Sequence, residues 1–381
     1  MKFGLLSGAY INAGDFLIVE RTKALLLKIF PDCEIVEYLR NKALDNQVEE
    51  INKLDALIVA GGPAYMTYIY PNIIPLVDDL SKITTKIIPI GVGWYGENTK
   101  SDYVYNYYKF TDKTLKFLKR METDAGFLSC RDYFSCRILN NNGLFNFKLT
   151  GCPAWYNLKK IDIVTPKKLK IKDINKIYIS DPANIKNLKQ IPKLIEYLKA
   201  KFNNAQIIFV FHRRSEGNGA EKEYMKCEEY LANNDIEYID ISSSSKGFEC
   251  YNDADLHIGY RVHAHIYNLS ERNLSILIEE DGRGAGVNEV LGMAHIYAYN
   301  PYKTGKNYYI FNDFLSKIKR KVLRFKKYYD NEFLLEELDA WIKICFNNDL
   351  ESFSLAYKKM QATYYEMEKF IKNTLEKTND R

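Results

Sequence analysis

The stretch "KFGLLSGAYINAGDFLIVERTKALLLKIF", residues 2–30, sets a pattern that the rest of the chain repeats. A short apolar strand at 2–8 is followed, after a glycine-containing turn, by an amphipathic helical segment at 15–30. Continuously apolar strands that alternate with helices are typical of a parallel sheet covered by helices on both faces. The pattern therefore predicts an α/β fold.

The alternation runs twice along the chain, with a break between the two runs. Strands are expected in the first run at 2–8, 34–39, 55–62, 86–93 and 126–130, and in the second run at 176–181, 206–211, 236–241, 255–260 and 275–280. The break at 159–176 is rich in lysine and contains a proline, as interdomain linkers often do. We therefore expect two tandem Rossmann-like domains, with a ligand cleft at the carboxyl ends of their strands. The expected parts are an N-terminal domain (1–158), the linker (159–176), a second domain (177–306) and C-terminal helices (307–381).

Composition narrows the classes of protein that this chain can belong to. The 381 residues are 46% hydrophobic and 27% charged, as in ordinary globular proteins. A net charge of +5, with lysine and arginine spread along the chain, does not indicate a nucleic-acid binder. Seven cysteines without a C-x-x-C pair indicate reduced thiols rather than a disulfide framework or a zinc site. No apolar run approaches 18 residues and no signal peptide is recognisable, so we expect a cytoplasmic protein.

The loop after the first strand, "SGAYINAGDFLI" (7–18), carries Asn12 and Asp15 next to a glycine. It matches neither the phosphate-binding P-loop nor the dinucleotide-binding glycine motif. In a structural interpretation, Asp15 is the N-cap of the following helix. In a functional interpretation, Asn12 and Asp15 lie at the mouth of the cleft, where Asp15 accepts a proton from an acceptor hydroxyl.

Glycines and aromatic residues follow two further strands of the first run. "AGGPAYM" (60–66) contains Gly62 and Tyr65, and "GVGWYGEN" (91–98) contains Trp94 and Tyr95. The glycines alone indicate turns, but their combination with aromatic side chains favours a sugar-binding rim. In "CRDYFSCRIL" (130–139) the structural interpretation is that an aspartate caps a helix and pairs with the arginine before it.

In the second run, charged residues follow two apolar strands. Arg213 and Arg214 follow the strand at 206–211, where guanidinium groups could clamp a carboxylate or a phosphate. "DLHIGYRVHAH" (255–265) holds three of the five histidines of the chain at a strand-to-helix junction. His257 alternates with apolar residues and is expected to be structural, whereas Arg261 and His263 lie where a helix N-terminus favours an anion. The histidine spacing fits no zinc motif, so we predict no metal site.

These segments together resemble the polysaccharide pyruvyl transferase family. The resemblance rests on the N-x-G-D loop at 12–15, "DALIVAGGP" (55–63), "RDYFSCRIL" (131–139) and, most specifically, "IGYRVHAHI" (258–266). Two departures from the family pattern are Pro63 after the third strand and Arg283 where a lysine is often found. The resemblance implies a two-domain fold like that of GT-B glycosyltransferases, over roughly residues 1–300.

The resemblance also implies transfer of pyruvate from phosphoenolpyruvate, as a ketal, onto two hydroxyls of a sugar in a bacterial surface glycan or its precursor. Arg213, Arg214, Arg261 and His263 would then bind the anionic donor. His263 would act as acid or phosphate clamp, Asp15 as base, and Asn12, Gly62, Tyr65, Trp94 and Tyr95 would contact the acceptor. Apart from the donor substrate, no cofactor is expected.

Two other functions stay open at this point. A glycosyltransferase of the same architecture would use the arginines for a nucleotide-sugar diphosphate, with Glu279 or Glu280 binding the ribose hydroxyls. A binding module without catalytic activity would use the cleft to hold a glycan.

The segment "SKIKRKVLRFKKYY" (316–329) alternates basic and apolar residues at helical spacing. It is either a helix packed on the second domain or a basic amphipathic helix that contacts an anionic membrane surface. The second interpretation is compatible with a lipid-linked acceptor. The sequence leaves the oligomeric state undetermined.

Overall fold

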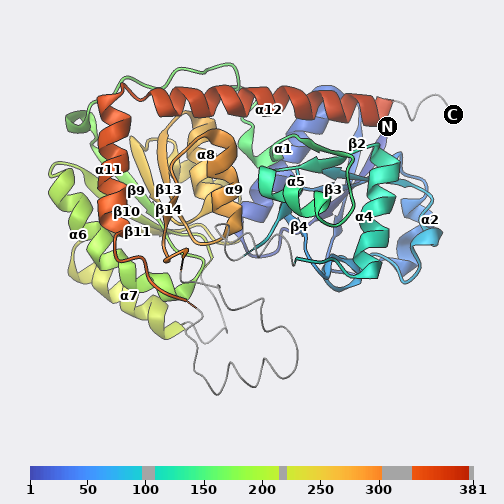
Figure 1. Ribbon diagram of the computed structural model, residues 1–381, viewed down its shortest axis with the longest axis horizontal. Helices are drawn as coiled ribbons and strands as arrows, with labels where there is room; N and C mark the ends of the chain where they lie inside the picture. The colour runs from blue at the N-terminus through green and yellow to red at the C-terminus, as the bar shows by residue number, and fades with distance from the viewer. Residues whose placement is uncertain (97–107, 214–220, 303–327, 377–381) are drawn as a thin grey trace.

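The computed structural model describes residues 1–96, 108–213, 221–302 and 328–376. Two parallel sheets lie side by side in the molecule, one in each half of the chain (Figure 1). The strands of the first sheet, in spatial order, are β2 (Glu34–Leu39), β1 (Lys2–Ser7), β3 (Ala56–Ala60) and β5 (Lys86–Ile90). Those of the second are β11 (Glu237–Asp240), β10 (Gln206–Phe211), β9 (Lys176–Ser180), β12 (Leu256–Gly259), β13 (Leu274–Glu279) and β14 (Ile296–Tyr297). The predicted fold class of two Rossmann-like domains is confirmed.

Two small parallel pairs extend the first domain. They are β4 (Pro63–Tyr65) with β6 (Gly93–Trp94), and β7 (Leu128–Cys130) with β8 (Phe147–Leu149). The helices of the first domain are α1 (Ala13–Ile29), α2 (Val48–Ile51), α4 (Asp112–Ala125) and α5 (Tyr133–Asn140). Those of the rest of the chain are α6 (Ile191–Lys201), α7 (Glu221–Asn233), α8 (Val262–Glu271), α9 (Gly282–Leu291), α11 (Leu334–Asn347) and α12 (Glu351–Leu375).

Two expected helices do not form. The segment after Pro71 contains one irregular turn at Ile69–Ile73 with a non-helical residue inside it, and the chain from there to β5 has only the short 3₁₀ turn Leu80–Lys82. After β11 the expected helix is replaced by the 3₁₀ turn Lys246–Tyr251. Each of the two turns still contributes a buried aromatic side chain to the core, Tyr70 in the first and Phe248 in the second.

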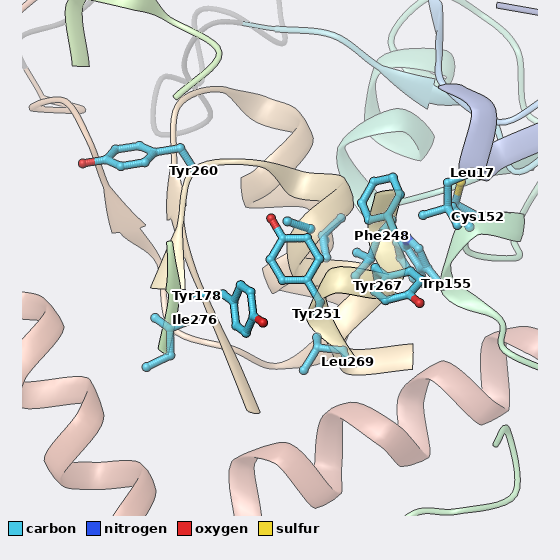
Figure 2. Packing of buried hydrophobic residues seen from close by; sticks show 14 of the residues in the cluster. Leu17, Cys152, Trp155, Tyr178, Phe248, Tyr251, Tyr260, Tyr267, Leu269 and Ile276 are labelled. Atoms are coloured by element: carbon cyan, nitrogen blue, oxygen red, sulfur yellow. The ribbon is translucent and has the colours of Figure 1, made fainter. Parts of the chain in front are cut away.

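One cluster of buried hydrophobic side chains extends through both domains, so the two domains pack directly against each other. Leu17 of α1 and the pair Cys152 and Trp155 belong to the same buried cluster as Phe248 and Tyr267 of the second domain (Figure 2). α12 runs from the second domain across to the first (Figure 1). Near its beginning Tyr357 donates to the carbonyl of Asn273, and at its end Thr374 donates to the carbonyl of Ala125.

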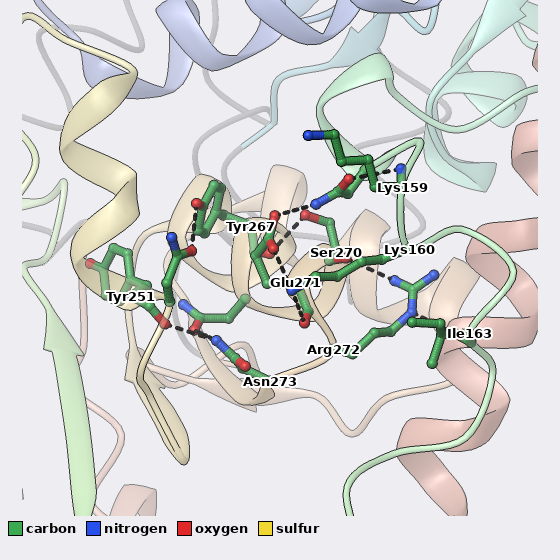
Figure 3. A network of polar contacts seen from close by, with 12 residues as sticks. Lys159, Lys160, Ile163, Tyr251, Tyr267, Ser270, Glu271, Arg272 and Asn273 are labelled. Atoms are coloured by element: carbon green, nitrogen blue, oxygen red, sulfur yellow. Dashed lines mark hydrogen bonds and ion pairs between the residues drawn. The ribbon is translucent and has the colours of Figure 1, made fainter.

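The first part of the expected linker is tied to the end of α8 by a polar network (Figure 3). The carboxylate of Glu271 accepts hydrogen bonds from Asn157 and Arg21, and it forms an ion pair with Lys160 at 2.8 Å. Arg272, in a left-handed conformation with φ 66°, donates to the carbonyls of Ile161 and Ile163. These contacts fix residues 157–163 against the second domain.

Within the described ranges, none of the helices combines the length and the apolar character that a bilayer-spanning segment needs. Residues 316–327 of the basic segment considered for membrane contact lie outside the described residues, and so does Arg214.

Candidate functional site

A pocket of about 180 Å³ lies between the two domains and brings together residues from distant parts of the sequence. We call it the interdomain pocket. The first domain contributes side chains from the start of α1 and from the ends of β2, β3 and β7, and the second domain contributes them from the end of β10 and the starts of α8 and α9. The lining residues are Asn12, Asp15, Arg40, Gly62, Arg131, Cys152, Trp155, Arg213, Val262, His263, Ile266 and Arg283.

Four arginines give the pocket a strong positive potential. Arg131 pairs with Asp132 at 3.1 Å, and Arg283 forms a bidentate pair with Asp281. Arg40 and Arg213 have no carboxylate within ion-pair distance among the residues that the structure describes. Among the described residues that line the pocket, Asp15 is the only acidic one, so cations outnumber anions in this lining. Such a site suits a small ligand with more than one negative charge.

Three basic side chains of the pocket pack directly against the main chain at glycines. A Cβ atom on Gly8 would lie 2.6 Å from the guanidinium carbon of Arg40, and one on Gly93 would lie 2.3 Å from that of Arg131. A Cβ on Gly14 would lie 1.9 Å from Nδ1 of His263. Because glycine has no Cβ, a guanidinium group or an imidazole can approach the main chain at these positions more closely than it could if any other residue stood there.

The structure at the start of α1 shows which residue of the loop caps this helix. Asn12, not Asp15, is the N-cap, because its side-chain oxygen accepts from the backbone N–H of Gly14. The expectation that Asp15 caps the helix is wrong. The Asp15 side chain lines the pocket and accepts a hydrogen bond from Nδ2 of Asn12 at 3.2 Å. Burial raises the pKa of Asp15, and this effect is partly offset by Arg40 and the bond from Asn12.

The three histidines of 255–265 lie in three different environments. His257 is fully buried and bonds to the hydroxyls of Ser275 and Ser180, which confirms its structural role. His265 is also fully buried, with Nδ1 at 2.8 Å from the Ser275 hydroxyl. His263 alone points into the interdomain pocket. Its ring forms no hydrogen bond among the described residues.

The surroundings of His263 determine its protonation state in the empty pocket. Burial and the neighbouring cations Arg283, Arg131 and Arg261 lower the pKa of His263 to about 3. The imidazole is therefore neutral at neutral pH when the pocket is empty, and a protonated ring beside a bound phosphate stays a prediction. A bound dianion would reverse the sign of the local potential and favour the protonated ring.

Arg261 lies beside the pocket and has a structural partner. Its guanidinium donates two hydrogen bonds to Asp181, at 2.7 and 2.5 Å, and that carboxylate is completely buried. Removing one member of a buried pair leaves the other charge unpaired and costs about 3–5 kcal/mol. Arg261→Ala is therefore expected to destabilise the fold as well as to remove a cation beside the pocket.

The aromatic residues expected to form a sugar-binding rim are divided by the fold. Tyr65 and Trp94 have no exposed surface, and the Tyr65 hydroxyl donates to the carbonyl of Ser129. Their rings fill the core under β4 and β6, so they are not available to a sugar. Tyr95 is 38% exposed and lies under the guanidinium of Arg283, 5.0 Å from its ring centre.

The carboxylates considered for ribose binding are engaged within the protein. Glu279 is fully buried and accepts from Asn288 and His295. Glu280 accepts from the backbone N–H groups of Ala183 and Asn184.

The sequence interpretation missed Arg40 as a site residue. It directly follows β2, the position that had drawn attention to Arg213 after β10, so the same rule could have found it. Arg131 had been interpreted as a partner of Asp132 only; Asp132 does cap α5, but Arg131 also lines the pocket. Arg283 had been noted only as a departure from a family pattern.

The comparisons with known proteins agree with this architecture. A family model described as polysaccharide pyruvyl transferase matches residues 12–267. A glycosyltransferase from Rickettsia africae has a similar structure, with a TM-score of 0.52 at 12% identity, covering 100% of this chain and 99% of that one. The Staphylococcus aureus MnaA structure with UDP has a TM-score of 0.49 at 12% identity, covering 92% and 97%. No curated protein matches the chain. The structural likeness to the Rickettsia enzyme shows the GT-B-like fold alone.

Proposed function

The chain belongs to the polysaccharide pyruvyl transferase family, and we propose that it transfers pyruvate from phosphoenolpyruvate, as a ketal, onto two hydroxyl groups of a sugar in a bacterial surface glycan or its precursor. The observation that carries this proposal is the interdomain pocket, whose described lining includes four arginines, His263 and a single carboxylate. Phosphoenolpyruvate carries a carboxylate and a phosphate on the same carbon, C2. A small cavity with cations from several directions is the environment that such a trianion needs.

The division of cations over two domains suggests how the donor is held. Arg40 and Arg131 come from the first domain, and Arg213 and Arg283 come from the second. In the proposed complex the donor bridges the domains. Its phosphate lies near His263 at the N-terminus of α8, where backbone N–H groups also favour an anion.

The proposed reaction has two steps. In the first, a sugar hydroxyl adds to C2 of phosphoenolpyruvate while C3 receives a proton, which converts the methylene into a methyl group. In the second, a neighbouring hydroxyl attacks C2 and the C–O bond to phosphate breaks, which gives the ketal and inorganic phosphate. The two hydroxyl protons are thereby accounted for, one on C3 and one on the released phosphate or its acid–base partner.

Two side chains have the chemistry for these proton transfers. Asp15, with its raised pKa and its position at the pocket, would take the proton from the attacking hydroxyl. His263, once protonated beside the bound phosphate, would supply a proton to C3 or to the leaving phosphate. General acid–base catalysis by one such group contributes on the order of 10²–10⁴-fold. The proposal requires no metal ion, because the arginines supply the positive charge.

Binding of phosphoenolpyruvate to Arg40→Gln tests the proposal, with Arg120→Gln as the matched control. Arg120 lies in α4 of the same domain and pairs with Asp124, away from the pocket. One charge-assisted hydrogen bond contributes about 1.5–3 kcal/mol, so the dissociation constant should rise by about 10- to 150-fold in Arg40→Gln only. Equal affinity in the parent and Arg40→Gln would contradict the proposed site.

The same assay separates this reaction from a glycosyltransferase. UDP-, GDP- and CMP-sugars are titrated beside phosphoenolpyruvate, and phosphate release is measured with a sugar acceptor. Transfer from a nucleotide-sugar without consumption of phosphoenolpyruvate would favour the alternative function.

A further inference from the structure

A larger pocket of about 800 Å³ lies in the second domain and shares Arg213 with the interdomain pocket. We call it the second-domain pocket. It lies beyond the carboxyl ends of β9 and β10, between the 3₁₀ turn Ile185–Gln190 and α7. Ligands of open parallel sheets bind at that edge. Because one side chain lines both spaces, a ligand in this pocket would lie beside the proposed donor.

The lining of this pocket is basic on one side and apolar on the other. In the described part of the chain, the charged side chains that line it are Lys186, Lys189, Lys226, Arg213, Arg261 and one carboxylate, Glu223. Its apolar surface comes from residues such as Leu188, Pro192, Tyr224 and Tyr230. The combination favours a ligand that has both negative charge and a less polar body.

Three of these cations already interact with other side chains of the protein, so an anion is expected to bind at the remaining two. Lys189 pairs with Asp330 at 2.6 Å, Lys186 lies over the ring of Tyr328, and Arg261 pairs with Asp181. Lys226 and Arg213 have no ion-pair partner among the described residues. An anion would therefore bind between Lys226 on α7 and Arg213 at the end of β10.

The chain beside the pocket is fixed by a partly buried hydrogen-bond cluster. The carboxylate of Glu280 accepts from the N–H groups of Ala183 and Asn184 and from the side chain of Asn187. These bonds hold the chain between β9 and the turn Ile185–Gln190. This connection supplies Asn184 to the lining, and the turn supplies Lys186. The pocket is thus built on a defined backbone.

We propose that the second-domain pocket binds the diphosphate end of a glycosyl diphosphate acceptor, with the sugar directed past Arg213 towards the interdomain pocket. This inference rests on the proposed function, because it assigns the second substrate of that reaction. It also transfers the main acceptor contacts from the first domain, where the sequence had placed them, to the second. The interdomain pocket, at about 180 Å³, holds the small donor but has no room for a phosphorylated glycan as well.

The diphosphate can come from a nucleotide or from a polyprenyl lipid, and the shared chemistry is what the pocket recognises. The probes are therefore inorganic pyrophosphate, UDP-N-acetylglucosamine and a short-chain polyprenyl diphosphate sugar. Each is titrated into the full-length protein in the presence of saturating phosphoenolpyruvate, so that the interdomain pocket is occupied.

The test variant is Lys226→Glu, and the matched control is Lys116→Glu on α4 of the first domain. Both lysines are exposed, and the two substitutions change the net charge equally. Lys226→Glu should weaken pyrophosphate binding at least tenfold and leave phosphoenolpyruvate binding unchanged, and Lys116→Glu should change neither. The diphosphate sugar that consumes phosphoenolpyruvate and releases phosphate identifies the source of the acceptor.

Equal pyrophosphate affinity in both variants and the parent would overturn this inference while leaving the donor site untouched. If the parent protein does not bind phosphoenolpyruvate, that result would instead contradict the proposed function. Transfer of sugar from UDP-N-acetylglucosamine without consumption of phosphoenolpyruvate would overturn both.

Discussion

Replacing Gly14 by alanine should uncouple the two domains at the candidate site. Gly14 lies in the first turn of α1, where alanine would normally stabilise the helix by about 0.5–1 kcal/mol. The added Cβ would, however, lie 1.9 Å from Nδ1 of His263, well inside van der Waals contact. The imidazole or the start of α1 must then move, and overpacking of this kind costs about 1–3 kcal/mol. The expected net effect of Gly14→Ala is a loss of up to about 2.5 kcal/mol, together with weaker phosphoenolpyruvate binding.

A double-mutant cycle with His263→Ala isolates the clash. Without the imidazole the Cβ meets no ring, so Gly14→Ala in that background should be neutral or stabilising by up to about 1 kcal/mol. The coupling between the two positions should therefore be about 1–3 kcal/mol. Urea unfolding of the four proteins measures it, and thermal shift with phosphoenolpyruvate gives the binding effect. An equal effect of Gly14→Ala in both backgrounds would refute the contact on which the site is built.

Two further predictions concern titratable groups. Asp15→Asn should keep donor binding, or strengthen it, because a negative charge leaves the anion pocket, and should lower turnover by about 10²–10⁴-fold; helix capping stays intact because Asn12 is the cap. In the parent, turnover should fall on acidification through a pKa above the usual value for an aspartate, and normal turnover of Asp15→Asn would leave that carboxylate no catalytic role. The second prediction is acid destabilisation: burial lowers the pKa of His265 to about 3, so the unfolded chain binds the proton first and stability falls as the pH drops below about 6.5. His265 alone accounts for about 2 kcal/mol of the loss in unfolding free energy between pH 7 and pH 5. Urea unfolding of His265→Gln should therefore show a loss over this pH range that is smaller than in the parent by that amount. A pH dependence equal to that of the parent would contradict the assignment.

The sequence by itself determined the architecture and much of the chemistry of the pocket. Strand-to-helix alternation depends on local periodicity, which is why it predicted both parallel sheets and a strand that begins at residue 176. The rule that functional side chains follow the carboxyl ends of strands also depends only on local order. It found Asp15, Arg213 and His263, which come together in the interdomain pocket from three separate segments.

Only the tertiary structure decided which of these side chains are available to a ligand. Trp94 and Arg261 also follow strands, but Trp94 is buried in the core and Arg261 is paired with buried Asp181. The lowered pKa of His263 depends first on its burial and then on Arg283 and Arg131, and the choice between Asn12 and Asp15 as helix cap depends on one side-chain conformation. Burial and electrostatic potential are sums over neighbours brought together from the whole chain, so a local pattern cannot contain them.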